Sequence, residues 1–257
     1  MKIGICGGID EMSVMEEIGY DFMELSAKGT VAPLEDKEVF AKHLKKIKKE
    51  NLPVVAFNNF IPGDLKITGE NVNPDKLKYY VETALSRVKS IGGEVVVFGS
   101  GGARRIPEGF SRDKGWEQLK NFLHMTADIA QKNDVVIALE PLNSGETNIF
   151  NTFEEGLKMV KEVNRPEAIK ILADLYHVEK ENEPYENVLE GKDWLAHVHV
   201  ADTGRLHPGT GDYDYDKFIS ILKEINYQGG ISIECRWENK EEEAREALEF
   251  LHKKLKE

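Results

Sequence analysis

Residues 135–140 read Val-Val-Ile-Ala-Leu-Glu, a run of five apolar residues that ends in a carboxylate. Strands that are buried on both faces of a parallel sheet are continuously apolar, and branched side chains such as valine and isoleucine favour strands. A charged side chain at the end of such a strand is costly to bury without a partner. The stretch therefore predicts a parallel strand with a functional residue at its carboxyl end.

Three later strand-like stretches end in the same way. They are Ile171-Leu172-Ala173-Asp174, His197-Val198-His199 and Ile231-Ser232-Ile233-Glu234. Isolated carboxylates at the tips of apolar strands would be unfavourable, whereas one cation at a common rim would satisfy them together. The repeated pattern points to an enzyme with a metal site.

Working outward from these stretches, apolar strand-like runs alternate with polar segments of helical period. We expect strands at 2–6, 22–27, 54–60, 94–100, 135–141, 169–176, 196–201 and 230–235. We expect helices at 36–50, 74–91, 114–132, 152–164, 215–225 and 240–256, with Asn73-Pro74 and Asn151-Thr152 as helix starts. No Gly-x-Gly-x-x-Gly turn follows the first strand. The pattern predicts one α/β domain, a single (β/α)8 TIM barrel over residues 1–257.

Composition excludes several classes of protein. The net charge of -12 opposes binding to nucleic acid. No apolar run approaches the roughly 18 residues that a membrane span requires, and the amino terminus does not read as a signal peptide. Two cysteines, Cys6 and Cys235, make no disulfide framework. We expect a soluble cytoplasmic protein that binds neither nucleic acid nor a membrane.

In a parallel barrel, the active site lies at the carboxyl ends of the strands. Four side chains on the fifth to eighth strands are expected there: Glu140, Asp174, His199 and Glu234. Neighbouring strands lie about 4.8 Å apart, so these side chains can converge on one point. Three carboxylates and one imidazole suit a divalent ion; we favour Mn²⁺, with Mg²⁺, Co²⁺ or Zn²⁺ as alternatives.

Two assignments stay open at this point. Either glutamate, taken singly, could instead form a structural ion pair with Arg205 or Arg236. His197 and His199 point to the same side of their strand, so either could be the ligand, and we favour His199 because it lies nearer the tip.

The stretch Glu140-Pro141-Leu142-Asn143-Ser144-Gly145-Glu146, followed by Asn151-Thr152, resembles a stretch of the ketose 3-epimerases. These are the D-tagatose and D-psicose 3-epimerase type of the xylose-isomerase-like TIM-barrel sugar (phosphate) isomerase/epimerase superfamily. The resemblance includes Asp174-Leu175-Tyr176-His177, His197-Val198-His199 with Arg205, Pro208-Gly209-Thr210-Gly211 and Ile233-Glu234. These motifs span the C-terminal half, and the strand count extends the likeness to nearly the whole chain.

This resemblance implies a metal-dependent isomerase and a role for each matching residue. It implies that Glu140, Asp174, His199 and Glu234 bind one divalent metal and that Glu140 and Glu234 are the catalytic acid/base pair. It also implies that Glu146, His177 and Arg205 bind the sugar. The expected reaction is proton transfer at C3 of a ketose, or a related keto-sugar, through a cis-enediolate. Moving a proton beside a carbonyl requires a base, an electrophile and a proton donor, which two carboxylates and a metal supply.

Each of the three expected sugar-binding residues could instead have a purely structural role. His177 could close a strand as a satisfied histidine, Arg205 could pair with Asp202, and Glu146 could cap the helix near residue 152.

Other activities on the same site are an inosose-type keto-polyol dehydratase and an aldose–ketose isomerase, because both also begin with proton removal beside a carbonyl. A catalytically silent sugar-binding protein is disfavoured by the complete set of acid/base residue types. An apurinic endonuclease would need additional histidines at the ends of the third and fourth strands, and the chain has none there.

Departures from the epimerase pattern bear on the substrate. Many ketose 3-epimerases carry Arg-Phe where this chain has Ser144-Gly145, and aromatic residues where it has Cys6-Gly7-Gly8. The pocket should therefore be more open, and a free hexulose need not be the preferred ligand. We expect a small-molecule sugar or sugar phosphate as the partner, and the resemblance makes a homodimer or homotetramer a reasonable expectation.

Overall fold

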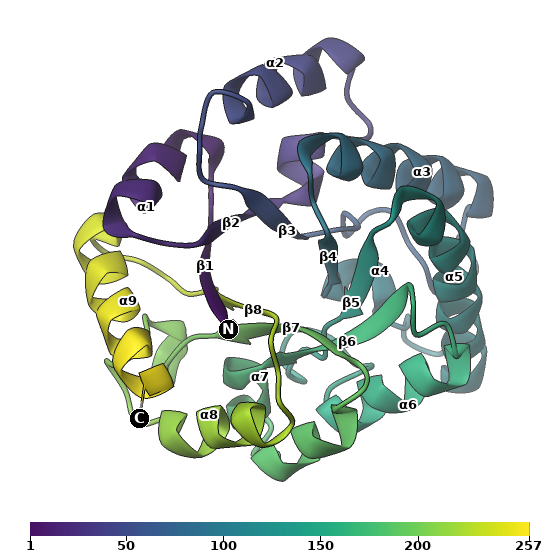
Figure 1. Ribbon diagram of the computed structural model, residues 1–257. Helices are drawn as coiled ribbons and strands as arrows, with labels where there is room; N and C mark the ends of the chain where they lie inside the picture. The colour runs from purple at the N-terminus through teal and green to yellow at the C-terminus, as the bar shows by residue number, and fades with distance from the viewer. Residues whose placement is uncertain (257) are drawn as a thin grey trace.

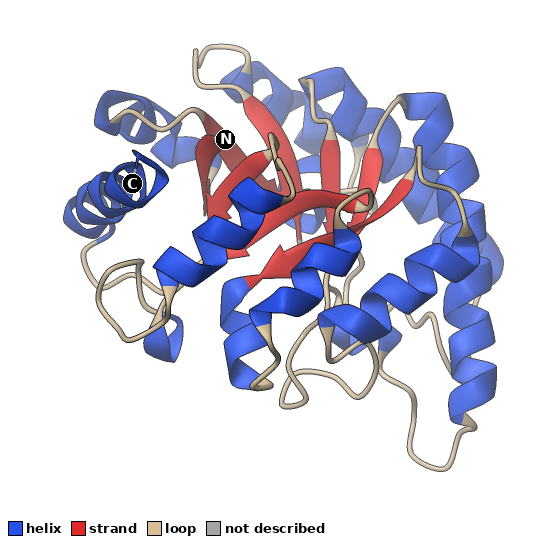
Figure 2. Ribbon diagram, turned by 60° about the horizontal axis from the view of Figure 1, so that its bottom comes forward, coloured by secondary structure: helices blue, strands red, loops and turns tan. Residues whose placement is uncertain are grey.

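Eight parallel strands form a closed barrel in the computed structural model, which describes residues 1–256. Each strand pairs with its neighbours in chain order, and β1 pairs with β8 to close the ring. Figure 1 shows the helices arranged around this barrel, and Figure 2 shows the strands enclosed by them from another side. The predicted (β/α)8 TIM barrel is confirmed.

All eight predicted strands are present, although most are shorter at the carboxyl end than expected. Their bounds are β1 (Lys2–Gly7), β2 (Phe22–Ser26), β3 (Val54–Asn58), β4 (Val95–Phe98), β5 (Val136–Leu139), β6 (Ile169–Asp174), β7 (Leu195–Val200) and β8 (Gly230–Ile233). The difference in β6 bears on the site, because this strand ends at Asp174, where a helix begins at once. Apolar residues that continue into a helix cannot be told from strand residues by hydropathy alone.

The six predicted helices correspond to α2 (Lys37–Ile47), α3 (Pro74–Ile91), α5 (Arg112–Asn133), α6 (Phe153–Val163), α8 (Tyr215–Glu224) and α9 (Lys240–Lys256). Three shorter helices were not predicted: α1 (Met12–Ile18), α4 (Gly101–Arg104) and α7 (Leu175–Lys180). The structure also contains short segments of 3-10 or π type: η1 (Ile9–Glu11), η2 (Ala27–Val31), η3 (Tyr185–Gly191) and η4 (Thr203–Arg205). Segments of so few residues are too short to show a helical period.

Helix α3 illustrates how the sequence determines where a helix begins. The Asn73 side chain accepts a hydrogen bond from the backbone N–H of Lys76 at 2.9 Å, and Pro74 occupies the first turn. Thr152 caps α6 in the same way, through the N–H of Glu155. Both predicted helix starts are confirmed, because capping depends on local residue types that the sequence displays.

Alternation along the strands divides the buried residues into two groups. Val97, Ala138 and Leu172 form a small apolar cluster that is separate from the large core beneath the helices. Side chains two residues apart lie on the same face of a strand. Glu140 and Asp174 therefore face the barrel interior, as Ala138 and Leu172 do.

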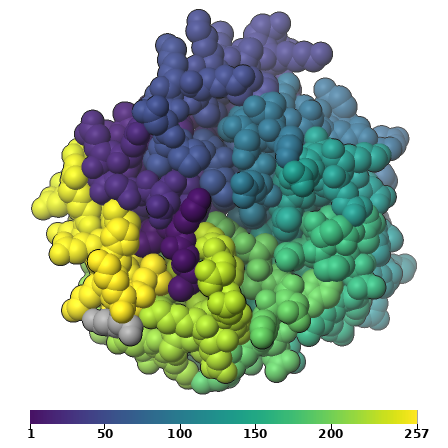
Figure 3. Space-filling view, in the orientation of Figure 1, coloured from purple at the N-terminus to yellow at the C-terminus, as the bar shows by residue number. Residues whose placement is uncertain are grey.

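The first and last strands lie side by side. The register pairs Ile3 with Ile231 and Ile5 with Ile233, so β1 completes the barrel next to β8. The purple N-terminal segment and the yellow-green and yellow C-terminal segments adjoin in the space-filling view (Figure 3). No helix among residues 1–256 is both long enough and apolar enough to cross a bilayer.

Candidate active site

Four side chains meet at the carboxyl ends of β5 to β8. Asp174 on β6 stands opposite His199 on β7 in the strand register. Glu140 and Glu234 are the first residues after β5 and β8. One potential ligand atom from each of these four residues lies within 4.8 Å of the others. The structure thus brings together all four residues that the sequence proposed as metal ligands.

Two buried atoms of this cluster lack a hydrogen-bond partner among the described residues, namely Glu140 Oε1 and His199 Nδ1. They lie 3.3 Å apart, and His199 Nδ1 is 3.6 Å from Glu234 Oε2. A buried polar atom without a partner costs about 1–3 kcal/mol. Convergence of such atoms with two further carboxylates is what a cation site requires, so the donor set fits a divalent ion.

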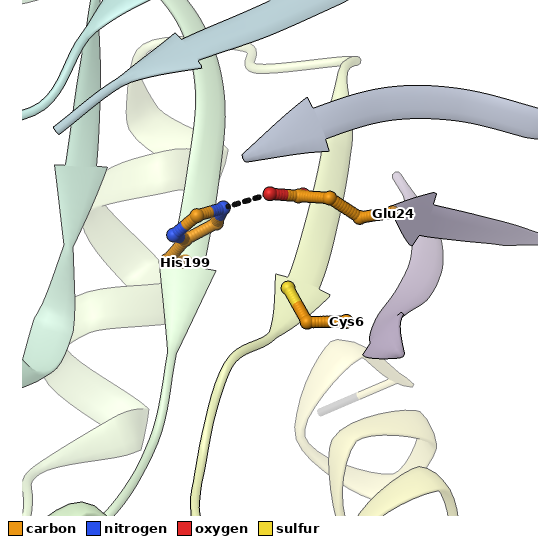
Figure 4. Close-up of side chains that lie close together, drawn as sticks. All are labelled: Cys6, Glu24 and His199. Carbon is orange, nitrogen blue, oxygen red and sulfur yellow. Dashed lines mark hydrogen bonds and ion pairs between the residues drawn. The ribbon is translucent and has the colours of Figure 1, made fainter. Parts of the chain in front are cut away.

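Only one of the two histidines on β7 belongs to this cluster. His199 turns Nδ1 toward the carboxylates, whereas His197 Nε2 lies 2.8 Å from Glu24 Oε2 and 3.0 Å from Ser232 Oγ. Glu24 on β2 also contacts His199 Nε2 at 2.9 Å, as Figure 4 shows. Sequence reasoning missed Glu24, although a lone acid within the apolar strand Phe22–Ser26 was a signal.

Electrostatics differ between the two glutamates. Burial raises the pKa of Glu140, and the nearby Glu234 adds to the effect. Burial alone would also raise the pKa of Glu234, but His199 and the Arg205 guanidinium outweigh it and lower that pKa to about 2. Burial raises the pKa of Asp174. The cluster therefore combines carboxylates of unequal acidity in one buried place.

His177 points a hydrogen-bond donor toward the cluster. It lies on α7, whose first turn is capped by Asp174 through the N–H of Tyr176. His177 Nδ1 accepts from the backbone N–H of Asn143 at 3.1 Å, so in the neutral ring Nε2 carries the proton. That Nε2 is buried, has no hydrogen-bond partner among residues 1–256 and lies 3.6 Å from Asp174 Oδ2. His177 is thus a free donor on a helix and does not close a strand.

Arg205 links two of the predicted acidic residues. Its Nη2 donates to Glu234 Oε2 at 2.6 Å and its Nη1 to Glu146 Oε1 at 3.1 Å. The guanidinium also lies 5.0 Å from the centre of the Tyr176 ring. Its side chain therefore takes part in the site and does not pair with Asp202. The backbone of Arg205 has a φ of 62°, a conformation that L-residues seldom adopt and that often occurs at functional sites.

The sequence pattern of the xylose isomerase-like TIM barrel family matches residues 12–254. The chain belongs to this family. The predicted resemblance is confirmed.

Named relatives within the family include sugar epimerases. L-ribulose 3-epimerase of Methylomonas sp. (strain DH-1) is 38% identical over 145 residues, 49% of this chain and 50% of that protein. The 3-dehydro-D-guloside 4-epimerase of Escherichia coli (strain K12) is 26% identical over 235 residues, 89% of this chain and 87% of that protein. The first match thus spans only about half of its relative, whereas the second is nearly complete.

A solved structure extends the likeness in fold. The D-psicose 3-epimerase of Clostridium cellulolyticum H10, determined with D-tagatose, has a TM-score of 0.87 at 19% identity and covers 99% of both chains. At this identity the comparison shows the fold alone. The names of the family relatives support the prediction of an isomerase-type enzyme, because epimerases are isomerases.

A cavity of about 220 Å³ opens beside the carboxylates. This volume is below the roughly 300–1,000 Å³ of sites for drug-sized ligands, so it suits a ligand of about one sugar. Glu140, Glu146, Arg205 and Glu234 form one part of its wall. The rest comes from the end of β3 and from segments that follow β2, β3, β4 and β5: Lys28, Asn58, Asn59, Ile61, Gly63, Gly99, Ser100, Gly101, Gly102 and Leu142. Lys28 was not foreseen, because it lies in the short turn η2.

Proposed function

We propose that the protein is a divalent-metal-dependent sugar epimerase that transfers a proton at C3 of a ketose or related keto-sugar. The observation that carries this proposal is the convergence of Glu140, Asp174, His199 and Glu234, with two buried ligand atoms that lack a partner. The cavity beside them has the size of a sugar, and family relatives are named epimerases.

Glu140, Asp174, His199 and Glu234 would hold the ion. When bound there, a divalent ion supplies a Lewis acid that polarises the substrate carbonyl and makes the proton on the neighbouring carbon more acidic. Mn²⁺ is the ion we favour, because the donor set of three carboxylates and one imidazole suits a hard to borderline cation.

The two glutamates of the pair come from strands separated by β6 and β7 in the barrel order. One of them takes the proton from C3, and the other returns a proton to the opposite face of the enediolate, which inverts that carbon. His177 Nε2–H and the Arg205 guanidinium donate hydrogen bonds to sugar oxygens near the carbonyl and offset the negative charge that develops there. Glu146 accepts a hydrogen bond from a sugar hydroxyl and holds Arg205 in place.

The deciding experiment is proton NMR after incubation in D₂O. Wild-type protein loaded with Mn²⁺ is incubated with L-ribulose, D-psicose, D-tagatose, their phosphates and inosose, and the ion is removed before the spectra are recorded. We expect deuterium at the carbon beside the carbonyl together with a new epimer. Loss of water from inosose would instead assign a dehydratase, and an aldose product would assign an aldose–ketose isomerase.

Glu234→Gln is the matched variant, since it keeps the shape of the side chain and removes its basicity. We expect exchange to fall at least about 10³-fold with an unchanged circular dichroism spectrum, in line with the loss of a general base. Chelation of the ion should abolish exchange in the wild type, and added Mn²⁺ should restore it. Near-normal exchange in Glu234→Gln, or full activity after chelation, would contradict the proposal.

A second candidate is epimerisation at C4 of a 3-keto-glycoside. The relative whose match is nearly complete is named a 3-dehydro-D-guloside 4-epimerase. The small Ser144-Gly145 pair also leaves space where ketose 3-epimerases carry a larger Arg-Phe pair. The same residues would move the proton, because C4 is again the carbon beside the ketone. Including a 3-keto-glucoside in the substrate panel separates the two reactions.

A further inference from the structure

A fully buried carboxylate lies beneath the proposed metal ligands. Glu24 on β2 has no exposed surface. Its Oε2 lies 2.8 Å from His197 Nε2, and its Oε1 lies 2.9 Å from His199 Nε2. Each carboxylate oxygen therefore serves a different imidazole. Burying a carboxylate in the interior of a barrel costs free energy unless it is paired in this way. The presence of Glu24 there therefore requires an explanation.

The contact determines which nitrogen of His199 faces the ligand cluster. An ionised carboxylate only accepts hydrogen bonds, so both Nε2 atoms act as donors. In the neutral imidazole of His199 the unprotonated nitrogen is then Nδ1, the atom without a partner that lies 3.3 Å from Glu140 Oε1. The Glu24 side chain thus orients the ring and selects its tautomer at once.

His197 holds the second oxygen of Glu24 in position. His197 Nε2 lies 3.0 Å from Ser232 Oγ as well as near Glu24, and the His197 and His199 rings are nearly perpendicular, at 82°. The network joins β2, β7 and β8 across the barrel interior. Because its members are buried and bonded to one another, the carboxylate has little freedom to turn away from His199.

Cys6 lies beside the same pair, as Figure 4 shows, and a second ion held by Cys6, Glu24 and His199 is the alternative reading. His199 Nε2 and both oxygens of Glu24 already take part in hydrogen bonds. An ion at that place would have to break these bonds and strip the proton from His199 Nε2. The geometry favours an orienting network over a second metal site.

We propose that Glu24 is a positioning residue that holds His199 with Nδ1 directed at the metal. This rests on the proposed metal site. Carboxylates that accept a hydrogen bond from a metal-binding histidine typically contribute 10- to 100-fold to metal affinity. Glu24→Gln keeps the size of the side chain, but its amide offers only one acceptor oxygen for two donating rings. One imidazole must therefore turn or change its tautomer.

Two measurements on Glu24→Gln test the proposal. Long-range ¹H–¹⁵N correlation spectra of metal-free protein, with ¹⁵N-labelled histidine, report which nitrogen of His199 carries the proton. We expect a proton on His199 Nε2, hydrogen-bonded to Glu24, in the wild type, and partial or complete loss of that Nε2–H signal in the variant. Titration calorimetry with Mn²⁺ should show that the dissociation constant of the variant is about 10- to 100-fold larger than that of the wild type.

Ser232→Ala is the matched control, because it removes a polar partner of His197 and leaves the Glu24–His199 bond in place. Its Mn²⁺ affinity should stay within about threefold of the wild type. If Glu24→Gln does not fold, Glu24→Asp is measured in the same way; its shorter side chain cannot reach both rings. A folded Glu24 variant with the wild-type tautomer and Mn²⁺ affinity would overturn the proposal. A wild type that binds no Mn²⁺ would refute the metal site, while the tautomer of the metal-free protein would still decide whether Glu24 orients His199.

Discussion

Gly99 sets where the Glu140 carboxylate can lie. It follows β4, and a Cβ built on Gly99 would come within 2.2 Å of Glu140 Oε2. The end of a side chain moves more easily than a backbone. A larger residue at position 99 would therefore displace the carboxylate from the ligand cluster and leave the strand where it is.

Gly99→Ala should accordingly damage function more than folding. We expect kcat/KM on the substrate found by NMR to fall at least about tenfold, equivalent to about 1.4 kcal/mol. The dissociation constant for Mn²⁺ should increase, and the melting temperature should stay similar to that of the wild type. Gly8→Ala is the control, since its Cβ would meet only Glu11 Oε2 at 3.6 Å, an ordinary contact. Equal activity of both variants would mean that Glu140 tolerates the displacement.

Arg205 provides a second prediction for a single residue. Its planar guanidinium bridges Glu146 and Glu234, which the single amino group of lysine cannot do with the same geometry. We expect Arg205→Lys to lower kcat/KM about 10- to 100-fold. Arg236→Lys, at an exposed position close in sequence, should stay within about twofold of the wild type. Steady-state kinetics on both variants make the comparison, and an unimpaired Arg205→Lys would show that the bridge is not needed.

The sequence allowed the ligand cluster to be proposed because each of its residues ends an apolar run. It placed His177 near Asp174 but could not show that Nε2 is free, since this depends on the Asn143 N–H from another loop. Glu24 was missed for a related reason. Its partners are 173 and 175 residues away along the chain, and only the barrel closure reveals that they share one interior.

Among the elements, α7 shows why the boundaries were the weakest part of the prediction. Residues 175–176 are apolar or aromatic and were assigned to the preceding strand, yet the Asp174 side chain caps a helix at once. A helix of six residues makes too few turns to display its period. Aspartate is a preferred N-cap residue, so the sequence allowed Asp174 to be interpreted as a helix cap. The same residue could equally be interpreted as a metal ligand at the end of a strand.

The cap of α3 allows an element to be perturbed separately from the site. Asn73→Ala removes the acceptor for the Lys76 N–H and should lower the free energy of unfolding by about 1 kcal/mol. In a protein of this size that corresponds to roughly 2–4 °C in melting temperature. Asn73→Ser should recover most of the loss, and both variants should keep wild-type kcat. Thermal unfolding followed by circular dichroism provides the test; an Asn73→Ala variant as stable as the wild type would mean that solvent replaces the cap.

On the scale of the whole molecule, the ring closes only when β1 meets β8, so residues near both chain ends contribute to one structure. The strand order and the barrel were predictable because eight alternations of strand and helix have few arrangements. Whether residues 1–257 act as one cooperative domain, and whether the protein is a dimer or tetramer, stay predictions, because both depend on energies that an arrangement of strands does not contain.

Buried tyrosines should make this barrel sensitive to alkali. Burial raises the pKa of Tyr20, Tyr80, Tyr215 and Tyr227 well above the value near 10 of an unfolded chain. Above about pH 10 the unfolded chain releases protons that the folded protein retains, so stability is complete below that pH and falls as pH rises. We expect the melting temperature to decline between about pH 9.5 and 11.

Absorbance at 295 nm monitors the same groups directly. Of the eight tyrosines, these four should ionise only together with the loss of the circular dichroism signal. Guanidinium-unfolded protein is the reference, in which all should titrate near pH 10. Ordinary titration of all eight in protein that stays folded would show that the barrel admits hydroxide to its core.

The carboxylate shared by two imidazoles also limits how this chain can diverge. Changing position 24, 197 or 199 alone leaves a donor or acceptor buried without its counterpart, a loss of about 1–3 kcal/mol that selection would act against. Apolar interior residues such as Val97 and Ala138 can change size in small steps with a modest loss of stability. Among descendants of a common ancestor, the three polar positions should therefore be inherited as a unit, and lineages that abandon one of them should have abandoned the others too.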